Sequence, residues 1–336
     1  MSARSSTRTE CVAAAVLAAL ACACDKSAGS ASGEGSRSPP AVRIAISIDW
    51  EGAYFLPPSL AALDQFRKDN PGVPVTHMLN AAYYTKPGAD RAEATRTIRR
   101  AVLEGDELGL HIHAWKSLLA AAGVAPRDGP SFLSRTGGLM RFEDDIGFDV
   151  DLAVFSVGEM RAVMAKSREI LAAEKLAPGT SFRAGAWLAT TNVLEAARAE
   201  GFTVDSSATD PAWFDEEEVP VLRQRLRELW SRIDRTTQPF WIETRDGRIL
   251  EMPDTGAMAD YLTVLEIQEH VERAAASLAK AGDRPVFVHL GFHAETADEF
   301  APRLSQALSV LRARNTPMRF ETLSRSADAA RRALER

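Results

Sequence analysis

The sequence predicts an α/β fold in which helices cover a mostly parallel sheet. Segments typical of strands alternate with segments typical of helices over most of the chain, and this order favours parallel strands joined by helical crossovers. The strand-like segments carry apolar side chains at every second position, so each predicted strand has two different faces. With 336 residues and 46% hydrophobic content, the chain is long enough for one α/β barrel with a sizeable core.

Strand and helix alternate strictly in the first part of the chain. The first strand begins at Val42, and Ile44, Ile46 and Ile48 alternate with small or acidic residues. In an α/β barrel the apolar face of such a strand meets the helix layer, and the other face points into the lumen. The next expected elements are a helix capped by Ser59 that ends near Lys68, a strand over residues 73–79, a helix capped by Asp90 that ends near Gly105, and a strand over residues 107–113.

An irregular segment separates the two halves of this pattern. Residues 115–152 are rich in Gly, Pro, Asp and scattered aromatics, which indicates a long loop or insertion at the active face. Ser156 and Glu159 form a capping box that begins a helix ending near Glu174. The remaining expected elements are strands over residues 181–187, 202–207, 240–243, 248–252, 285–293 and 318–321, a helix capped by Thr191, a short helix inside an insertion at 208–238, and helices over 265–281 and 297–314, the last helix.

Residues 1–41 have the composition of an export signal followed by a linker. Arg4 and Arg8 precede an apolar run over residues 12–23, which is too short to span a bilayer but suits a secretory signal. We assign residues 1–24 to a signal peptide, residues 25–41, rich in Ser, Gly, Ala and Pro, to a flexible linker, and residues 42–336 to the folded domain.

The signal has two interpretations, since the small residues around Cys22 and Cys24 fit a cleavage site or a lipoprotein signal with a lipidated cysteine. We therefore expect an exported protein, periplasmic or at the cell surface, with or without a lipid anchor in the membrane. A disordered leader on a cytosolic protein is the alternative.

Charge and cysteine usage narrow the class of protein further. The net charge is -6 and the sequence pI is near 5.7, and no basic run is present, so we expect no nucleic-acid partner. All three cysteines lie before residue 25, so the folded domain needs no disulfide.

Titratable residues recur in pairs at the carboxyl ends of three predicted strands, on the face without aliphatic side chains. These pairs are Asp49 and Glu51, His111 and His113, and His289 and His293. Because the carboxyl ends of parallel strands meet at the active face of such folds, we expect one hollow surrounded by six titratable groups. Two imidazoles and a carboxylate are a sufficient set for a catalytic divalent metal ion, and zinc suits them best. Single histidine pairs are often structural, and the recurrence is what favours a site.

Five ordered segments resemble the motifs of one enzyme family. The segments are Ser47-Ile-Asp-Trp-Glu-Gly, Glu107-Leu-Gly-Leu-His-Ile-His-Ala-Trp, Ser181-Phe-Arg-Ala-Gly-Ala-Trp, Val204-Asp-Ser-Ser and Val286-Phe-Val-His. In order and spacing they resemble the motifs of the polysaccharide deacetylases, the NodB-homology or carbohydrate esterase family four enzymes. The resemblance implies a distorted, incomplete (β/α) barrel that removes acetyl groups from N-acetylated polysaccharides or oligosaccharides with a divalent metal ion, commonly zinc.

The resemblance also implies a role for individual residues. Asp49 corresponds to the catalytic base and His111 to the first metal-binding histidine. Arg183 corresponds to the arginine that orients the base. Asp205 matches the aspartate that tunes the acid, and His289 matches the histidine that protonates the departing amine.

Two departures from the family pattern leave the metal ligands open. The family usually has adjacent aspartates in its first motif, whereas here Trp50 follows Asp49 and the next carboxylate is Glu51. The family's second metal-binding histidine lies four residues after the first, where this sequence has Trp115. Since His113 would share a strand face with the first histidine, we take it as the replacement. The expected ligands are His111, His113 and either Asp49 or Glu51.

Several further residues near these motifs have two interpretations. Trp50, Trp115 and Trp187 lie beside proposed site residues, where they either stack on sugar rings as substrate-binding residues or belong to the core. His293, together with Glu295, is expected to contact substrate or support the site. For the two remaining histidines a structural role is expected, half-buried for His77 and solvated on a helix for His270.

Three other functions use the same residues. A glycoside hydrolase could take its paired carboxylates from Asp49, Glu51 and Glu251, but this leaves the histidine pairs without a purpose. A metal-dependent amidohydrolase acting on a non-carbohydrate amide needs the same atoms as a deacetylase. An anchored carbohydrate-binding protein without turnover is the third alternative, and the two departures from the motifs favour it.

Overall fold

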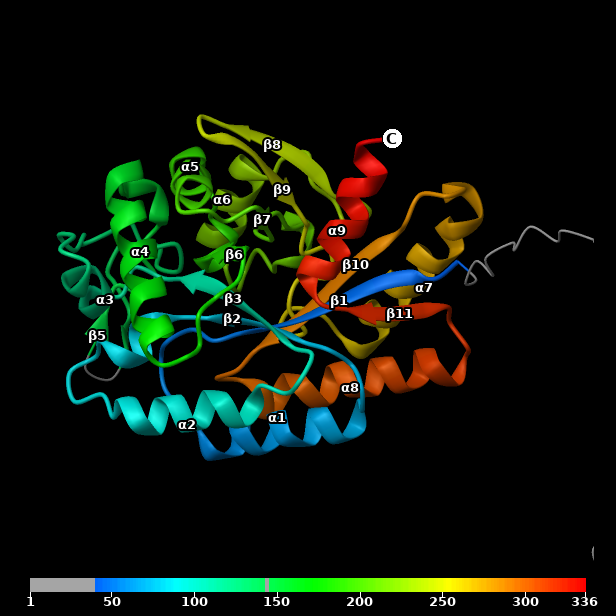
Figure 1. Cartoon of the computed structure of the whole chain (residues 1–336), viewed down its shortest axis with the longest axis horizontal. Coiled ribbons are helices and arrows are strands. Elements are labelled where there is room, and N and C mark those ends of the chain that lie inside the picture. The colour runs from blue at the N-terminus through cyan, green and yellow to red at the C-terminus, as the bar shows by residue number, and fades with distance from the viewer. Residues whose placement is uncertain (1–39, 143–144) are drawn as a thin grey trace, which may run out of the picture. The chain divides into compact units, whose positions relative to one another are not determined.

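The computed structural model describes residues 40–142 and 145–336 (Figure 1). The signal peptide expected at residues 1–24, and all but the last two residues of the linker expected at 25–41, lie outside the described residues. Among the described residues, no helix combines the length and apolar character needed to cross a membrane.

One nine-stranded sheet runs through the domain, in the order β10-β1-β2-β3-β6-β7-β9-β8, with β11 pairing with the first half of β1. All of its strand pairs are parallel except the β8–β9 hairpin. The strands are β1 (Val42–Asp49), β2 (Thr76–Leu79), β3 (Glu107–Ile112), β6 (Ser181–Ala184), β7 (Val204–Asp205), β8 (Phe240–Thr244), β9 (Gly247–Glu251), β10 (Phe287–His293) and β11 (Met318–Glu321). Because β10 and β8 end the order without pairing with each other, the sheet is a distorted, incomplete barrel, as predicted.

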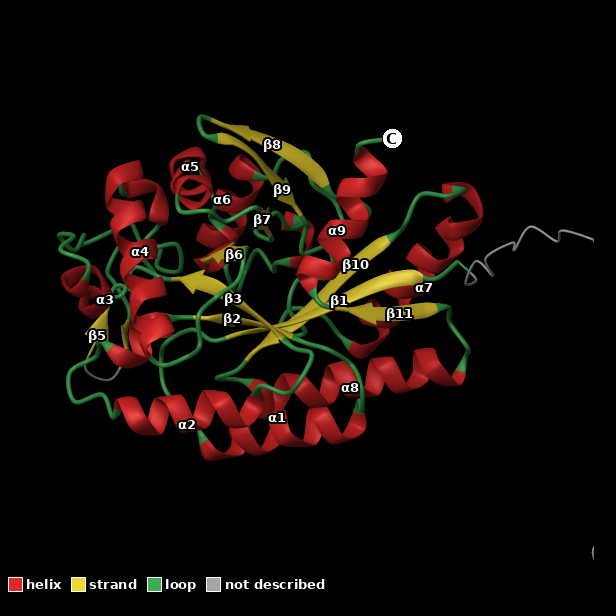
Figure 2. Cartoon of the chain, viewed as in Figure 1, coloured by secondary structure: helices red, strands yellow, loops and turns green. Residues whose placement is uncertain are grey.

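Helices cover the outside of this sheet, with α1, α2 and α8 side by side along one flank (Figure 2). The helices of the described chain are α1 (Pro57–Asp69), α2 (Arg91–Ala101), α3 (Lys116–Ala121), α4 (Val157–Ala173), α5 (Thr191–Ala199), α6 (Pro220–Leu229), α7 (Val264–Ala281), α8 (Ala297–Ala313) and α9 (Leu323–Leu334). A small hairpin of β4 (Arg141–Phe142) and β5 (Asp145–Ile146) lies in the segment expected to be irregular.

The first strand shows how the sequence pattern produces the layers. Ile44, Ile46 and Ile48 are at most 1% exposed and belong to the same apolar cluster as Leu63 and Phe66 of α1. Burying each of these isoleucines contributes roughly 1.5–3 kcal/mol relative to an exposed side chain. The alternation therefore directs the apolar face to the helices and leaves the other face for the interior of the barrel.

Helix α9, which was not predicted, fills the barrel interior at the end where the strands begin. Leu323, Ala327 and Ala330 of α9 pack in a second apolar cluster with Ala45 of β1 and Met78 of β2. The buried face of α9 consists mainly of alanine and serine, so the helix packs closely against the strands through small side chains. With α9 filling the end where the strands begin, the carboxyl ends of the strands are left for a site.

The expected helix starts are partly right. The capping box of Ser156 with Glu159 and the Asp90 cap are both present. Ser59 does not cap α1, because the helix begins at Pro57 and the Ser59 hydroxyl donates to the Glu295 carbonyl oxygen, 2.8 Å away. Helix α5 likewise begins at Thr191 itself.

Several strands are shorter than predicted, among them β2, which begins at Thr76, β10, which begins at Phe287, and two that end early. Instead of extending to Ser207, β7 ends at Asp205. β6 ends at Ala184, and a 3₁₀ turn over Gly185–Trp187 follows, in which Ala186 and Trp187 have φ of 53° and 58°. Left-handed backbone is uncommon for residues other than glycine and occurs often at functional sites.

Candidate active site

The carboxyl ends of β1, β3, β6 and β10 surround a cavity of about 210 Å³. Strand register brings the site together, since Asp49 pairs with His293 across β1 and β10, and His111 pairs with Arg183 across β3 and β6. Asp49, Glu51, His111, His113, Arg183 and His293 all line the cavity. Five of the six paired residues expected here therefore converge on one cavity, together with Arg183, whereas His289 does not line it.

Glu51 and two histidines form the cluster best suited to a metal ion. Glu51 Oε1 lies 3.2 Å from His111 Nε2, and Glu51 Oε2 lies 2.6 Å from His113 Nε2. One ligand atom from each residue lies within 4.8 Å of the others. Asp49, Glu51 and His293 form a second group that meets the same distance criterion, so Glu51 belongs to both groups and is the carboxylate that joins the two paired histidines.

Both imidazoles are held so that Nε2 faces the cluster. His111 Nδ1 lies 3.1 Å from the Arg183 carbonyl oxygen, and His113 Nδ1 lies 2.8 Å from that of Phe148. A carbonyl can only accept, so each Nδ1 carries the proton and each Nε2 presents a lone pair. Metal-ligating histidines commonly have this arrangement, so the donor set fits a divalent metal ion.

Electrostatics in the cluster favour an ionised carboxylate. Burial alone would raise the pKa of Glu51, but His113 and His111 outweigh it through charge and hydrogen bonds and hold the pKa well below its ordinary value. Burial lowers the pKa of His111, and the charges of Glu51 and Asp49 more than compensate, so that the pKa is raised. The ionised Glu51 thus stabilises positive charge at the Nε2 atoms, which a proton or a bound divalent cation can supply.

A glycine makes room for the second histidine. A Cβ atom at Gly185 would lie 2.6 Å from two ring atoms of His113 and 2.7 Å from the Ile112 carbonyl oxygen. The ring of His113 stacks on Phe148 on another side, with 4.1 Å between ring centroids. The position of His113 therefore depends on a glycine in a motif that is 72 residues away in sequence (185 minus 113).

Asp49 forms a buried ion pair with Arg183. Nη1 of Arg183 donates to both oxygens of Asp49, at 2.9 and 3.1 Å, and the side chains are 1% and 2% exposed. Nε and Nη2 of Arg183 donate to the carbonyl and hydroxyl oxygens of Ser206. Burial lowers the pKa of Arg183, but Asp49 and Asp254 more than offset this, so the guanidinium stays charged.

His289 lies behind this arginine and does not line the cavity. Its Nδ1 is 2.9 Å from Ser206 Oγ, and its Nε2 is 3.1 Å from Arg183 Nη2. Burial, followed by the charge of Arg183, holds the pKa of His289 well below its ordinary value, so the ring is neutral. His289 lies four residues before His293 on β10, which places it about 13 Å farther back along the strand. The predicted role of His289 as the acid does not fit this position. Only the later histidine of the pair reaches the cavity.

His293 is the histidine that reaches it. Its Nδ1 lies 2.7 Å from Asp260 Oδ1, and its Nε2 lies 3.5 Å from Glu51 Oε1. Burial lowers the pKa of His293, but the charge and hydrogen bond of Asp260 and the charge of Glu51 raise it to about 10. The sequence analysis did not single out Asp260, which lies in a loop without a motif.

Asp205 pairs with a carboxyl group instead of a histidine. Its Oδ1 accepts a hydrogen bond from Ser207 Oγ at 2.7 Å, and its neighbour Glu251 accepts one from the Ala208 backbone amide at 2.9 Å. Burial and the charge of Asp205 raise the pKa of Glu251 well above its usual value, which favours a shared proton between the two carboxyl groups. Glu251 does not line the cavity, so a glycoside hydrolase would lack the third carboxylate proposed for it.

Two of the three tryptophans expected to bind substrate belong to the core. Trp50 is 0% exposed and its Nε1 donates to His77 Nδ1, while Trp115 is 0% exposed and its Nε1 donates to the Glu51 carbonyl oxygen. Neither lines the cavity. Of the two interpretations left open for these residues, the core is the one that fits both, and Trp115 also fixes the backbone of Glu51.

Trp187 does line the cavity, with its Nε1 donating to Asp254 Oδ2 at 2.8 Å. Burial raises the pKa of Asp254 to about 6, although the charge of Arg183 opposes the shift.

The two remaining histidines are more buried than predicted. His77 is fully buried, not half-buried as expected, and His270 is 4% exposed, not solvated.

Glu295 supports the backbone around Glu51. Its oxygens accept hydrogen bonds from the backbone amides of Glu51 and Ala53, at 3.2 and 3.1 Å, and from the Tyr83 hydroxyl. Burial and the charge of Glu51 raise the pKa of Glu295 to about 7.

Aromatic side chains form most of the remaining wall, and no sequence pattern predicted them beyond the aromatic content of residues 115–152. These side chains are Tyr54, Phe132, Phe142, Phe148, Trp187 and Tyr261, with Leu133 and Leu222. A substrate therefore meets a charged floor and largely apolar sides.

Comparison with known proteins shows the fold and not the chemistry. No family model matches the sequence, and no curated protein matches it. A solved structure described as a polysaccharide deacetylase from Mycobacterium smegmatis is 14% identical, with a TM-score of 0.50, over 87% of this chain and 91% of that one. The structure of the PuuE allantoinase is also 14% identical, with a TM-score of 0.50, over 89% of this chain and 94% of that one. The chain thus has the polysaccharide deacetylase fold, as the sequence motifs implied.

Proposed function

We propose that the protein is a divergent, metal-dependent member of the polysaccharide deacetylase superfamily that removes acetyl groups from an N-acetylated cell-envelope or extracellular carbohydrate. The observation that carries the proposal is the Glu51–His111–His113 cluster, which shares one cavity with the Asp49–Arg183 ion pair. The fold and the order of the sequence motifs support it independently.

Glu51, His111 and His113 would hold the metal ion, and a nitrogen-rich set with one carboxylate suits zinc. When bound there, a divalent ion polarises an acyl oxygen and lowers the pKa of bound water toward neutrality. The protein contributes ligands whose orientation is already set, since both Nδ1 atoms donate to backbone carbonyls.

Asp49 is the general base of the proposed reaction. It lines the cavity, and Arg183 holds it in one orientation through both of its oxygens. A carboxylate in this position accepts the proton of the attacking water, and general-base catalysis typically contributes about 10²–10⁴-fold to the rate.

His293 takes the acid role that the sequence motifs implied for His289. Asp260 fixes the ring through Nδ1, so Nε2 is the atom that can give a proton to the departing amine nitrogen. Its Nε2 lies on the cavity side, 3.5 Å from Glu51. The Asp260–His293 pair thus supplies the orientation expected of Asp205 and His289.

A second candidate is the hydrolysis of a small non-carbohydrate amide. The cavity of about 210 Å³ has aromatic walls and is smaller than the roughly 300–1,000 Å³ of common ligand pockets. The fold likeness to a protein named an allantoinase shows that this fold is not confined to proteins named for polysaccharides. The catalytic residues would act in the same way on either amide.

The test measures acetate release from chitin oligomers, peptidoglycan and acetylated exopolysaccharide, and in parallel the hydrolysis of small aromatic and cyclic amides. His111→Ala and His113→Ala are each assayed for bound metal and for turnover. Loss of both is expected, and unchanged turnover in both variants would show that the cluster has no catalytic role. Turnover of small amides without acetate release from any glycan would favour the second candidate.

We also propose export, with residues 25–41 as the tether and acylation of Cys22 or Cys24 as the anchored form. The charged, apolar and small-residue segments of the N-terminus support it. The intact mass of the protein from membrane and soluble fractions tests it, since acylation adds the mass of lipid chains and an uncleaved leader contradicts export.

A further inference from the structure

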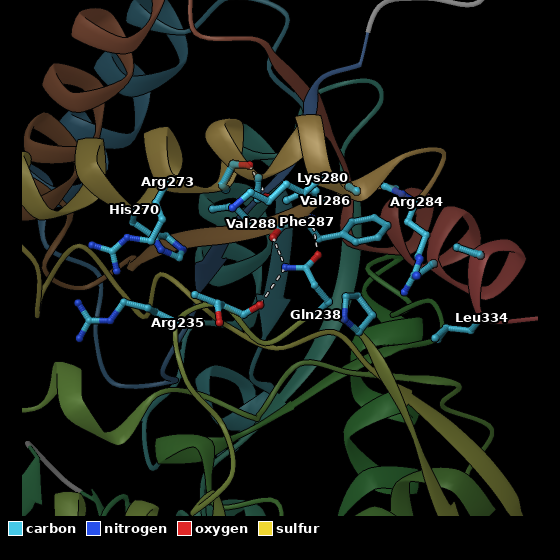
Figure 3. A pocket seen from close by; sticks show the side chains of 18 residues that line it. Arg235, Gln238, His270, Arg273, Lys280, Arg284, Val286, Phe287, Val288 and Leu334 are labelled. Carbon is cyan, nitrogen blue, oxygen red and sulfur yellow. Dashed lines mark hydrogen bonds between the residues drawn. The ribbon is translucent and has the colours of Figure 1, made fainter.

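A second and larger cavity, of about 490 Å³, lies at the opposite end of the sheet (Figure 3). Its walls come from the second half of α7, the beginning of β10, the end of α9 and residues 235–239. Phe287 in this wall pairs with Arg43 at the start of β1, whereas Asp49 of the active site pairs with His293. Six residue steps separate the two pairs, or about 20 Å along the strands, so the two cavities are distinct.

The charged side chains around this groove are all basic. Arg235, Arg273, Lys280 and Arg284 line it, and no Asp or Glu of the described chain does. This is unusual in a protein with 46 acidic and 40 basic residues. Arg235 is partly neutralised, because it forms an ion pair with Asp210 and lies over the Trp213 ring.

The other three cations are available to a ligand. Within residues 40–142 and 145–336, Arg273, Lys280 and Arg284 form no ion pair, and all three are exposed. Lys280 and Arg284 flank the end of α7, where a cation is favourable for the helix dipole. That effect does not account for Arg273, two turns earlier, or for the lack of lining acids.

Between the cations the groove is apolar. Val286, Phe287 and Val288 form one side, and Ala333 and Leu334 of α9 another, with Leu334 44% exposed. The polar side chain Gln238 is already engaged, because it accepts from the Phe287 amide at 2.8 Å and donates to the Phe287 carbonyl oxygen (Figure 3). Recognition would therefore come from the cations and the apolar surface together.

We propose that this groove binds an anionic phospholipid, with the phosphate at Arg273, Lys280 and Arg284 and the apolar part against Phe287 and Leu334. Charge complementarity favours this ligand, since clusters of cations beside apolar surface bind anionic membranes. The location favours it too, because the chain enters the domain at Val42, at the same end of the sheet. The active-site cavity would then face away from the membrane.

The test uses the full chain and the soluble lipid dihexanoyl phosphatidylglycerol below its micelle concentration, titrated by calorimetry. Dihexanoyl phosphatidylcholine and inorganic phosphate are titrated in the same way. The triple variant Arg273→Gln, Lys280→Gln, Arg284→Gln removes the three cations. A matched variant removes three exposed cations outside the groove, through Lys116→Gln, Lys175→Gln and Arg245→Gln.

Phosphatidylglycerol is expected to bind more tightly than either control ligand. The groove variant is expected to bind it with an affinity lower on the order of 100-fold, since each cation near an anionic lipid raises the affinity several-fold. The matched variant should bind like the parent. Equal binding by the groove variant would overturn the proposal, as would inorganic phosphate binding as tightly as the lipid, which would indicate a site for free anions. Amide hydrolysis by the groove variant is measured separately and should be unchanged, so this proposal and the catalytic one fail independently.

Discussion

Replacing Asp49 by Asn tests whether Asp49 is the general base, and the same replacement at the neighbouring Asp254 serves as the control. Asp49→Asn keeps the shape of the side chain and one hydrogen-bond acceptor for Arg183, but it cannot accept a proton from water. We expect kcat to fall about 10²–10⁴-fold, which corresponds to about 3–5 kcal/mol in the activation free energy. Bound metal should stay at the parent level, because the proposed ligands are Glu51, His111 and His113; loss of the metal would instead indicate the second group, Asp49, Glu51 and His293.

The same substitution has a predictable effect on stability. Breaking a buried ion pair by removing one charge destabilises a protein by about 3–5 kcal/mol. Here Arg183 keeps its two hydrogen bonds to Ser206, and Asp254 remains 3.7 Å away. We therefore expect a smaller loss in the free energy of unfolding, about 1–3 kcal/mol, measurable by urea denaturation.

Asp254→Asn is the matched control. Asp254 is also buried beside Arg183, but it does not line the cavity. An asparagine can still accept the hydrogen bond from Trp187 Nε1. This variant should keep kcat within a few-fold of the parent. Undiminished turnover by Asp49→Asn, or an equal loss in both variants, would refute the assignment of Asp49 as the base.

Three further predictions concern other residues of the domain. His293→Asn should lower kcat about 10²–10⁴-fold for an acetamide but much less for 4-nitrophenyl acetate, whose phenolate leaves without a proton; equal losses would contradict an acid role. Burial, with smaller contributions from Arg235 and Arg273, lowers the pKa of His270 to about 4 from 6.5. The unfolded chain therefore protonates His270 at a higher pH than the folded chain does. As the pH falls from 6.5 to about 4, the free energy of unfolding decreases by about 3 kcal/mol. His270→Gln should flatten this part of the profile of unfolding free energy against pH, and an unaltered profile would contradict the assignment. Gly185→Ala should displace His113 and lower both metal content and stability, by about 1–3 kcal/mol, whereas Gly158→Ala in α4, where a Cβ meets nothing within 4 Å, should leave metal content unchanged.

Much of the framework could be predicted because it depends on local patterns. The alternation in β1 directs Ile44, Ile46 and Ile48 to the helices, and the same alternation in β3 places His111 and His113 on one face, with 4.9 Å between ring centroids. The parallel order then brings the strand ends together. These steps need only the period of a strand and the rule that parallel strands share their carboxyl edge.

The parts that could not be predicted depend on distance along a strand or on contacts between remote segments. His289 and His293 share a face, but only His293 lies at the edge where the cavity forms. Asp260 reaches His293 from a loop that has no periodic pattern. Trp50 and Trp115 stand next to site residues in sequence, yet their rings turn into the core. Trp50 follows the last residue of β1 and Trp115 is the N-cap residue of α3, so the alternation of a strand no longer sets the direction of either side chain.

The metal content of the purified full chain tests the central claim most directly. We expect one tightly held divalent ion per chain, and we expect Glu51→Gln to lose this ion because the cluster then lacks its charged ligand. Asp49→Asn, two residues earlier in the chain, should retain it. A parent chain that binds no divalent ion with useful affinity, or a Glu51→Gln variant that binds it as tightly as the parent, would contradict the account.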